Sequence, residues 1–380
     1  MNASARPAPA QDSANPSVTS LELFFDLVFV FTITQLTTVL AREPNWTSLL
    51  QLTLIFGNVW WMYGGYAWLT NAVPPRELGV RLLLLVGMGG FLVIALAIPT
   101  AFRSGGIAFG VGYVTVTLVH TGIFLRTSQQ SVIEAVRRLG PFNLVTATML
   151  LVAGFTGGGA RWALFAAAFA LHWVTPYLTG IGGFRIRSAH FVERHGLILL
   201  IAIGESVVAL GIGLGAIELP AGRIAAALLG LALAAELWWL YFNGEQERAE
   251  TALEAAPEQR RPWLAVNAFG YGFLPTLGGI VLIAAGIKLA VLQFEQPAPL
   301  STALLLAVGL ALYLAGLALF RWLLHSGPLA IRLLLGAAAL PTAFFGLRIS
   351  PLAQLWALAV ILIVGIAGDS FLTKRAPLLG

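Results

Sequence analysis

Two carboxylates stand one helical turn apart at the start of a long apolar run. Glu22 and Asp26 lie within Leu21–Phe31, and all the remaining residues of this segment are apolar. Their spacing places both acids on one face of a helix. A charged side chain deep in a bilayer costs about 3 kcal/mol, so such acids are candidates for a cation site or a proton relay. Pairing with arginines such as Arg81 or Arg126 is the structural alternative.

A third acid lies in the middle of another apolar run. Glu205 falls within residues 193–216 and is flanked by Gly204 and Ser206. Lipid offers no partner to an acid at that depth. Glu205 could bind a cation, shuttle a proton, or hydrogen-bond as a neutral acid to a neighbouring carbonyl.

Other polar side chains interrupt apolar runs at helical spacing. Glu236 and Asn243 stand seven residues apart and share one face, and Asn58 belongs to a polar face of an earlier run. Such faces are expected to point into the protein. They could line a solute pathway or join helices through hydrogen bonds.

Two histidines and a proline are weaker candidates. His120 and His172 lie inside apolar runs and could relay protons, although a lone histidine is more often a hydrogen-bonded packing residue. Pro275 is followed by Gly278 and Gly279. A proline with paired glycines can break a membrane helix and expose carbonyl groups to an ion.

Motifs for metals, nucleotides and catalysis are missing. The chain has no cysteine, which excludes thiol nucleophiles and thiolate metal sites. The histidines of segment 190–195 match neither spacing known for zinc enzymes, and no phosphate-binding loop occurs. We expect no metal, no cofactor, no catalytic residue and no enzymatic activity.

The composition indicates a membrane protein. Hydrophobic residues make up 58% of the 380 residues and charged residues 10%, whereas a globular domain carries about 25% charged residues. The apolar runs are continuous over about 20 residues, which favours helices over a barrel. We predict an all-α, polytopic bundle that lies in a lipid bilayer. The basic residues are dispersed, so nucleic acid is not an expected partner.

Twelve spans are predicted from the apolar runs, and their loops carry an uneven charge. The runs are 20–40, 47–70, 78–101, 106–126, 140–156, 161–180, 193–216, 223–243, 263–288, 300–324, 329–347 and 352–372. Only six of the 22 basic residues fall on the side opposite the N-terminus: Arg42, Arg103, Arg161, Arg223, Lys288 and Arg348. This bias predicts that both termini are cytoplasmic.

Two segments lie outside the predicted spans. Residues 1–19 are small, polar and rich in proline, which is typical of a disordered tail. Residues 244–261 carry five glutamates and three arginines, so this cytoplasmic connection is expected to be a surface helix with a solvated face.

A repeated aromatic block suggests an internal duplication. Trp-Trp-x-Tyr occurs at Trp60 and again at Trp238, each time two residues after a polar side chain, Asn58 or Glu236. The two blocks lie 178 residues apart, close to half of the chain. We predict two parallel six-helix repeats, 20–180 and 181–380. Chance recurrence of membrane-interface aromatics is the alternative.

Two blocks resemble a known family. They are Glu22–Val30, followed by Gln35-Leu36, and Glu193–Leu197, leading into Gly204-Glu205-Ser206. With the Trp-Trp pairs, they are similar to the bacterial low temperature requirement protein A (LtrA) family over nearly the whole chain. The resemblance implies a bacterial cytoplasmic-membrane protein of a family named for a cold-growth phenotype.

The start of the first span is also distantly similar to another family. Phe24-Phe25-Asp26 looks like the Phe-Ser-Asp signature that opens each repeat of a family of duplicated six-helix potassium channels. Here Phe25 replaces the serine, and the second repeat opens with Arg194-His195-Gly196. The absence of a second aspartate argues against transferring a potassium pore directly.

These observations lead to two hypotheses. The first is a channel or secondary transporter for a small cation or solute that uses intramembrane carboxylates. The alternative is a membrane-embedded enzyme or a lipid-handling scaffold that acts at the headgroup level. Acids that converge in the middle of the bilayer favour transport, and acids that converge at the cytoplasmic surface beside a lipid-sized groove favour the alternative. The substrate, the driving ion and the oligomeric state do not follow from the sequence.

Overall fold

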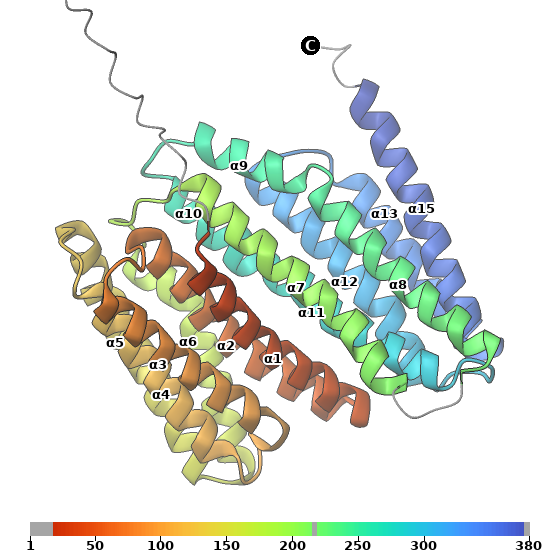
Figure 1. Ribbon diagram of the computed structural model, residues 1–380, viewed down its shortest axis with the longest axis horizontal. Helices are drawn as coiled ribbons and strands as arrows, with labels where there is room; N and C mark the ends of the chain where they lie inside the picture. The colour runs from red at the N-terminus through yellow and green to blue at the C-terminus, as the bar shows by residue number, and fades with distance from the viewer. Residues whose placement is uncertain (1–17, 215–218, 376–380) are drawn as a thin grey trace, which may run out of the picture.

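Every regular element in the described chain is helical (Figure 1). The computed structural model describes residues 18–214 and 219–375. The elements are α1 (Ser20–Arg42), α2 (Trp46–Ala72), α3 (Leu78–Ala97), η1 (Ile98–Thr100), α4 (Gly106–Phe124), α5 (Gln130–Phe155), α6 (Gly158–Thr179), α7 (Ser188–Leu214), α8 (Ala221–Phe242), α9 (Glu245–Ala255), α10 (Arg261–Ala265), η2 (Val266–Gly272), α11 (Phe273–Leu292), α12 (Leu300–Leu324), α13 (Ala330–Ala339), η3 (Leu340–Thr342), α14 (Ala343–Arg348) and α15 (Pro351–Arg375). The predicted all-α class is confirmed. Residues 1–17 of the predicted tail lie outside the described residues.

Nine helical segments in the described chain are long and apolar enough to cross a membrane. Helices α2, α6 and α7 occupy the other three predicted intervals, but they are not among the nine. Tryptophan, tyrosine and amide side chains lower the mean hydropathy of α2. A membrane protein of apolar helices is therefore confirmed, and the number twelve stays a prediction.

Helix α5 begins ten residues before the predicted span 140–156. Its first turns are amphipathic, with Val132 and Val136 buried and Arg137 and Arg138 exposed. A search for apolar runs misses such turns, because the polar and charged residues of their exposed face interrupt the run. The predicted boundary is therefore wrong by almost three turns.

Helix α1 lies between the two halves of the chain (Figure 1). It packs against α3 of the first half and against α7 and α11 of the second. Contacts between α1 and α7 keep a nearly constant separation in sequence: 172 residues for Glu22 and Arg194, 168 for Asp26 and Arg194, and 171 for Thr34 and Glu205. A constant separation means that α1 and α7 run parallel, side by side.

The predicted helix break at Pro275 is wrong, because α11 runs through this residue without interruption. The irregular turn precedes it: η2 is a π-helix. Its wider turn accommodates a proline, which has no N–H for the usual helical hydrogen bond. The Gly270 carbonyl in this turn accepts a hydrogen bond from Trp60 Nε1 at 3.0 Å. This bond is a second link between the halves.

The paired glycines after Pro275 allow close helix packing. A Cβ built on Gly279 would lie 2.5 Å from the Tyr313 backbone nitrogen and 2.7 Å from the Gly309 carbonyl oxygen of α12. Glycine is therefore required where α11 and α12 approach each other.

Gly279→Ala should destabilise the protein by about 1–3 kcal/mol, because the added methyl group forces α11 and α12 apart. Thermal unfolding in detergent measures the effect. Gly89→Ala on α3 is the matched control, since a Cβ there meets nothing within 4 Å. Equal melting temperatures for the two variants would contradict the packing argument.

Candidate functional site

A buried ionic cluster joins α1 to α7. Arg194 Nη1 donates to Glu22 Oε1 at 2.9 Å and to Thr70 Oγ1 at 2.6 Å, and Nη2 donates to Asp26 Oδ1 at 3.2 Å. The Tyr63 hydroxyl donates to the same Asp26 oxygen at 3.0 Å. All five side chains are buried. Three helices therefore meet at one guanidinium.

The start of α1 fixes the position of Glu22. Thr19 caps the helix, and its hydroxyl accepts from the Glu22 N–H at 3.4 Å. Glu22 Oε2 accepts in return from the Thr19 N–H at 2.9 Å. This capping box engages Oε2 and leaves Oε1 for Arg194. Asp26 follows one turn later on the same face.

The end of α2 positions the start of α7. Asn71 Oδ1 accepts from the Arg187 N–H at 3.1 Å, and Asn71 Nδ2 donates to the Arg187 carbonyl at 3.0 Å. The Arg187 guanidinium donates to the carbonyls of Thr70 and Asn71. Partial burial lowers the pKa of Arg187, and the charge of Glu22 opposes this shift. The clamp places His190 Nε2 3.2 Å from Glu22 Oε1.

Aromatic rings surround the guanidinium. Arg194 Cζ lies 5.5 Å from the centre of the Phe25 ring and 5.9 Å from that of Tyr63, distances at which cation–π attraction acts. Asp26 Oδ2 is buried and has no hydrogen-bond partner in the described chain. That oxygen is the position of the cluster where a proton or a cation could bind.

The arginines expected to pair with the two acids do not do so. Arg81 and Arg126 are exposed, and among the described residues Glu22 and Asp26 pair with Arg194 and His190 instead. The two acids form ion pairs, as the structural alternative predicts, but the predicted partners Arg81 and Arg126 are wrong. Spacing along the chain could not identify Arg194, since the pair depends on how α1 and α7 align.

Glu205 also lies on the α1–α7 interface. It is buried, and its Oε2 accepts from the Thr34 hydroxyl at 2.6 Å. Thr34 stands eight residues beyond Asp26, or about 12 Å further along α1. Between these positions, Phe29 and Ile33 are fully buried. Polar groups thus occupy two levels of one interface, with an apolar layer between them.

The remaining polar candidates lie elsewhere. Asn58 is buried within the first half, with its Oδ1 3.0 Å from His172 Nδ1. Glu236 is half-buried on α8, and its Oε2 has no partner in the described chain. Asn243 is exposed just after α8 ends. The expectation of an inward face is wrong for Asn243, because its side chain reaches the surface at the helix end.

The two intramembrane histidines differ. His172 belongs to a polar network, with its Nε2 2.6 Å from the Thr146 hydroxyl, which agrees with the packing interpretation. Neither ring nitrogen of His120 has a hydrogen-bond partner in the described chain. No group of three or more metal-ligating side chains occurs among the described residues.

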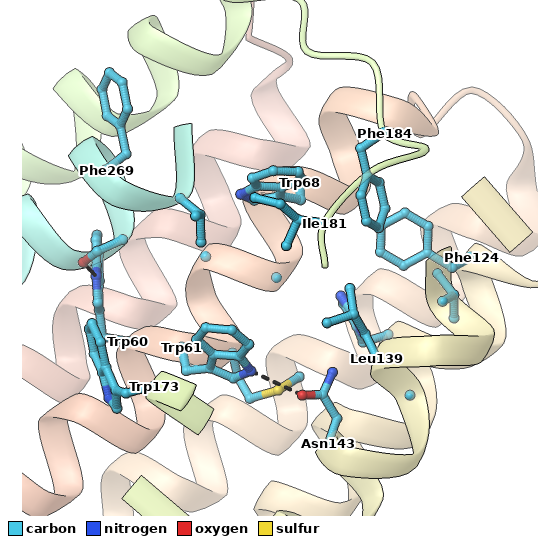
Figure 2. A pocket seen from close by; sticks show the side chains of 18 of the residues that line it. Trp60, Trp61, Trp68, Phe124, Leu139, Asn143, Trp173, Ile181, Phe184 and Phe269 are labelled. Carbon is cyan, nitrogen blue, oxygen red and sulfur yellow. Dashed lines mark hydrogen bonds between the residues drawn. The ribbon is translucent and has the colours of Figure 1, made fainter. Parts of the chain in front are cut away.

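Aromatic rings bound a pocket between the helices (Figure 2). His120 also lines this pocket. The pocket lies between α2, α4, α5 and η2. Trp61 Nε1 donates to Asn143 Oδ1 across it at 3.0 Å. No Asp or Glu lines this pocket, so it suits an uncharged or aromatic ligand better than a metal ion.

A second buried ionic cluster corrects the expectation for the connection 244–261. Helix α9 forms there, but its first residue, Glu245, is 1% exposed. Glu245 Oε1 accepts from Arg321 Nε at 2.6 Å and from Arg332 Nη2 at 3.2 Å. The solvated-face prediction is wrong for Glu245, because α12 and α13 bring arginines to the same point.

Comparison with known proteins identifies the family. The model of the bacterial low temperature requirement A protein (LtrA) family matches residues 17–367. The chain belongs to the LtrA family. The Rhizobium meliloti (strain 1021) protein RA0937 is 27% identical over 307 residues, which cover 78% of this chain and 75% of that protein. No solved structure matches. The cluster of Glu22, Asp26 and Arg194 thus lies within the matched region of an LtrA protein.

Arg194→Met should destabilise this LtrA protein by about 3–5 kcal/mol, because two buried carboxylates then lose their cation. Thermal unfolding in detergent measures the loss. Glu22→Gln/Asp26→Asn/Arg194→Met should recover most of it, since no uncompensated charge remains. Arg126→Met is the control and should leave stability unchanged. A melting temperature for Arg194→Met equal to that of the control would contradict the assigned ion pairs.

Proposed function

We propose that this LtrA protein moves a small cation or protons across the bacterial cytoplasmic membrane along the α1–α7 interface. The supporting observation is the alignment of three acids on that interface. Glu22 and Asp26 meet Arg194 near the start of α1, and Glu205 meets Thr34 further along. Intramembrane acids on one interface are typical of ion and proton pathways.

The apolar layer between the two polar levels would act as the barrier. Phe29, Ile33 and Leu199 are fully buried, and their helices, α1 and α7, contact each other directly. A hydrophobic constriction stops ions by excluding water. Separation of α1 from α7 would hydrate it, and rupture of the Asp26–Arg194 pair by a proton or cation would favour that separation.

The packing supports two parallel repeats and an interface near their axis. Helices α1, α2, α3 and α4 of the first half correspond to α7, α8, α11 and α12 of the second. The contacts of α3 with α1 and α4 recur as contacts of α11 with α7 and α12, and the pairing of α2 with α6 recurs in α8 with α15. Parallel repeats also agree with α1 and α7 running side by side. We extend the proposal to twelve spans with both termini cytoplasmic.

The convergence of Glu22 and Asp26 near the start of α1, beside a groove that Glu22 lines, is the arrangement that favours the enzyme or lipid-handling alternative, whereas the deeper position of Glu205 favours transport. We favour transport, because a catalytic acid needs a free oxygen. Glu22 uses Oε1 for Arg194 and Oε2 for the Thr19 cap, so neither oxygen is free to act as a general base.

The aromatic pocket favours a second version of the transport proposal, in which a small uncharged solute binds near His120 and Trp61. Asp26 would then couple solute movement to protons.

Reconstitution in liposomes tests the proposal. With gradients of K⁺, Na⁺ or protons applied one at a time and followed by ion-sensitive dyes, the wild type should carry at least one ion. Glu205→Gln should lower that flux at least tenfold, because the deeper binding group loses its charge. Glu43→Gln, at an exposed carboxylate beyond α1, should match the wild type.

Two results would contradict the proposal. One is the absence of flux under every gradient in wild-type protein that remains folded. The other is equal flux for Glu205→Gln and Glu43→Gln.

A further inference from the structure

A groove at the start of α1 combines arginines with leucines. Its lining includes Arg76, Arg81, Arg187, Leu78, Leu82 and Leu85. The groove is separate from the aromatic pocket and lies at the end of the bundle where basic residues predominate.

The arginines of the groove lack carboxylate partners. Arg76 and Arg81 are exposed and Arg187 is half-buried, and none of the three forms an ion pair with a described residue. Arg81 Nε donates to the Pro75 carbonyl at 3.0 Å, which holds its guanidinium at the rim. Glu22 also lines the groove, but Arg194 and His190 engage its carboxylate. The groove therefore attracts anions.

The leucines form one stripe on α3. Leu78, Leu82 and Leu85 are four and three residues apart, and they are 72%, 53% and 44% exposed. Helix α3 is among the segments apolar enough to span a membrane, so this stripe faces acyl chains. The stripe begins beside Arg76 and runs toward the middle of the bilayer.

We propose that this groove binds an anionic glycerophospholipid, with its phosphate on Arg76 and Arg81 and one acyl chain along the leucine stripe. Guanidinium groups bind phosphate oxygens in pairs, and basic pockets between membrane helices recognise anionic headgroups. A zwitterionic lipid would bring its own cation against the arginines. This site is independent of the transport proposal.

Lipid titration followed by native mass spectrometry tests the site. Purified protein in detergent is titrated with dioctanoyl phosphatidylglycerol or dioctanoyl phosphatidylcholine. Arg76→Gln/Arg81→Gln should weaken binding of phosphatidylglycerol about tenfold or more and leave that of phosphatidylcholine unchanged. Arg42→Gln/Arg103→Gln removes the same charge from exposed positions on the predicted opposite side and should bind like the wild type.

Two further measurements distinguish binding of a lipid from binding of a soluble anion. Leu82→Gln/Leu85→Gln should weaken binding of phosphatidylglycerol, because the acyl chain loses its stripe. Glycerol 3-phosphate at the same concentration should not displace the lipid. Efficient displacement would identify a soluble-anion site and overturn the proposal. Equal affinities for the two lipids, or equal losses in the two double arginine variants, would overturn it as well.

Discussion

The structure depends on one buried guanidinium shared by two acids. Arg194 of α7 forms ion pairs with both Glu22 and Asp26 of α1, and no other described cation is within ion-pairing distance of Asp26. Removing Arg194 leaves two buried carboxylates without their shared cation, which costs several kcal/mol. A shift of α1 along α7 would separate these charges, so the ion pairs fix the alignment of the two helices. This constraint sets the contact between the two halves of the chain.

The same alignment explains why Glu205, the deeper acid, has a hydrogen-bond partner on α1. With α1 and α7 parallel, Thr34 reaches Glu205 at 2.6 Å. The hydrogen bond from Trp60 of α2 to the π-helix η2 adds another link between the two halves. Other polar networks, such as that of His172, join helices within one half. The α1–α7 interface is thus a place where buried charges join the two halves of the chain.

Much of the fold could be predicted from the sequence, and much of the site could not. Apolar runs of about 20 residues predict membrane helices, because the bilayer thickness sets their length. The spacing of Glu22 and Asp26 correctly predicts that they share a face. Their partner Arg194 lies 168 residues beyond Asp26, and only the packing of α1 on α7 brings it there. The burial of Glu245 could not be predicted either. Its segment is rich in charged residues, which is typical of a solvated helix, and its partners Arg321 and Arg332 come from α12 and α13.

The absence of cysteine from the chain allows a direct test of the α1–α7 pathway. Single variants Thr34→Cys and Leu27→Cys are exposed to a charged, impermeant thiol reagent from either side of sealed vesicles, and modification is counted by mass. Leu27 is 57% exposed and faces lipid, so its cysteine should not react. Thr34→Cys should react from the side opposite the N-terminus, because water must reach the deeper polar level of a pathway. If Thr34→Cys resists modification from both sides as Leu27→Cys does, no aqueous route follows this interface and α1 and α7 do not form a pathway.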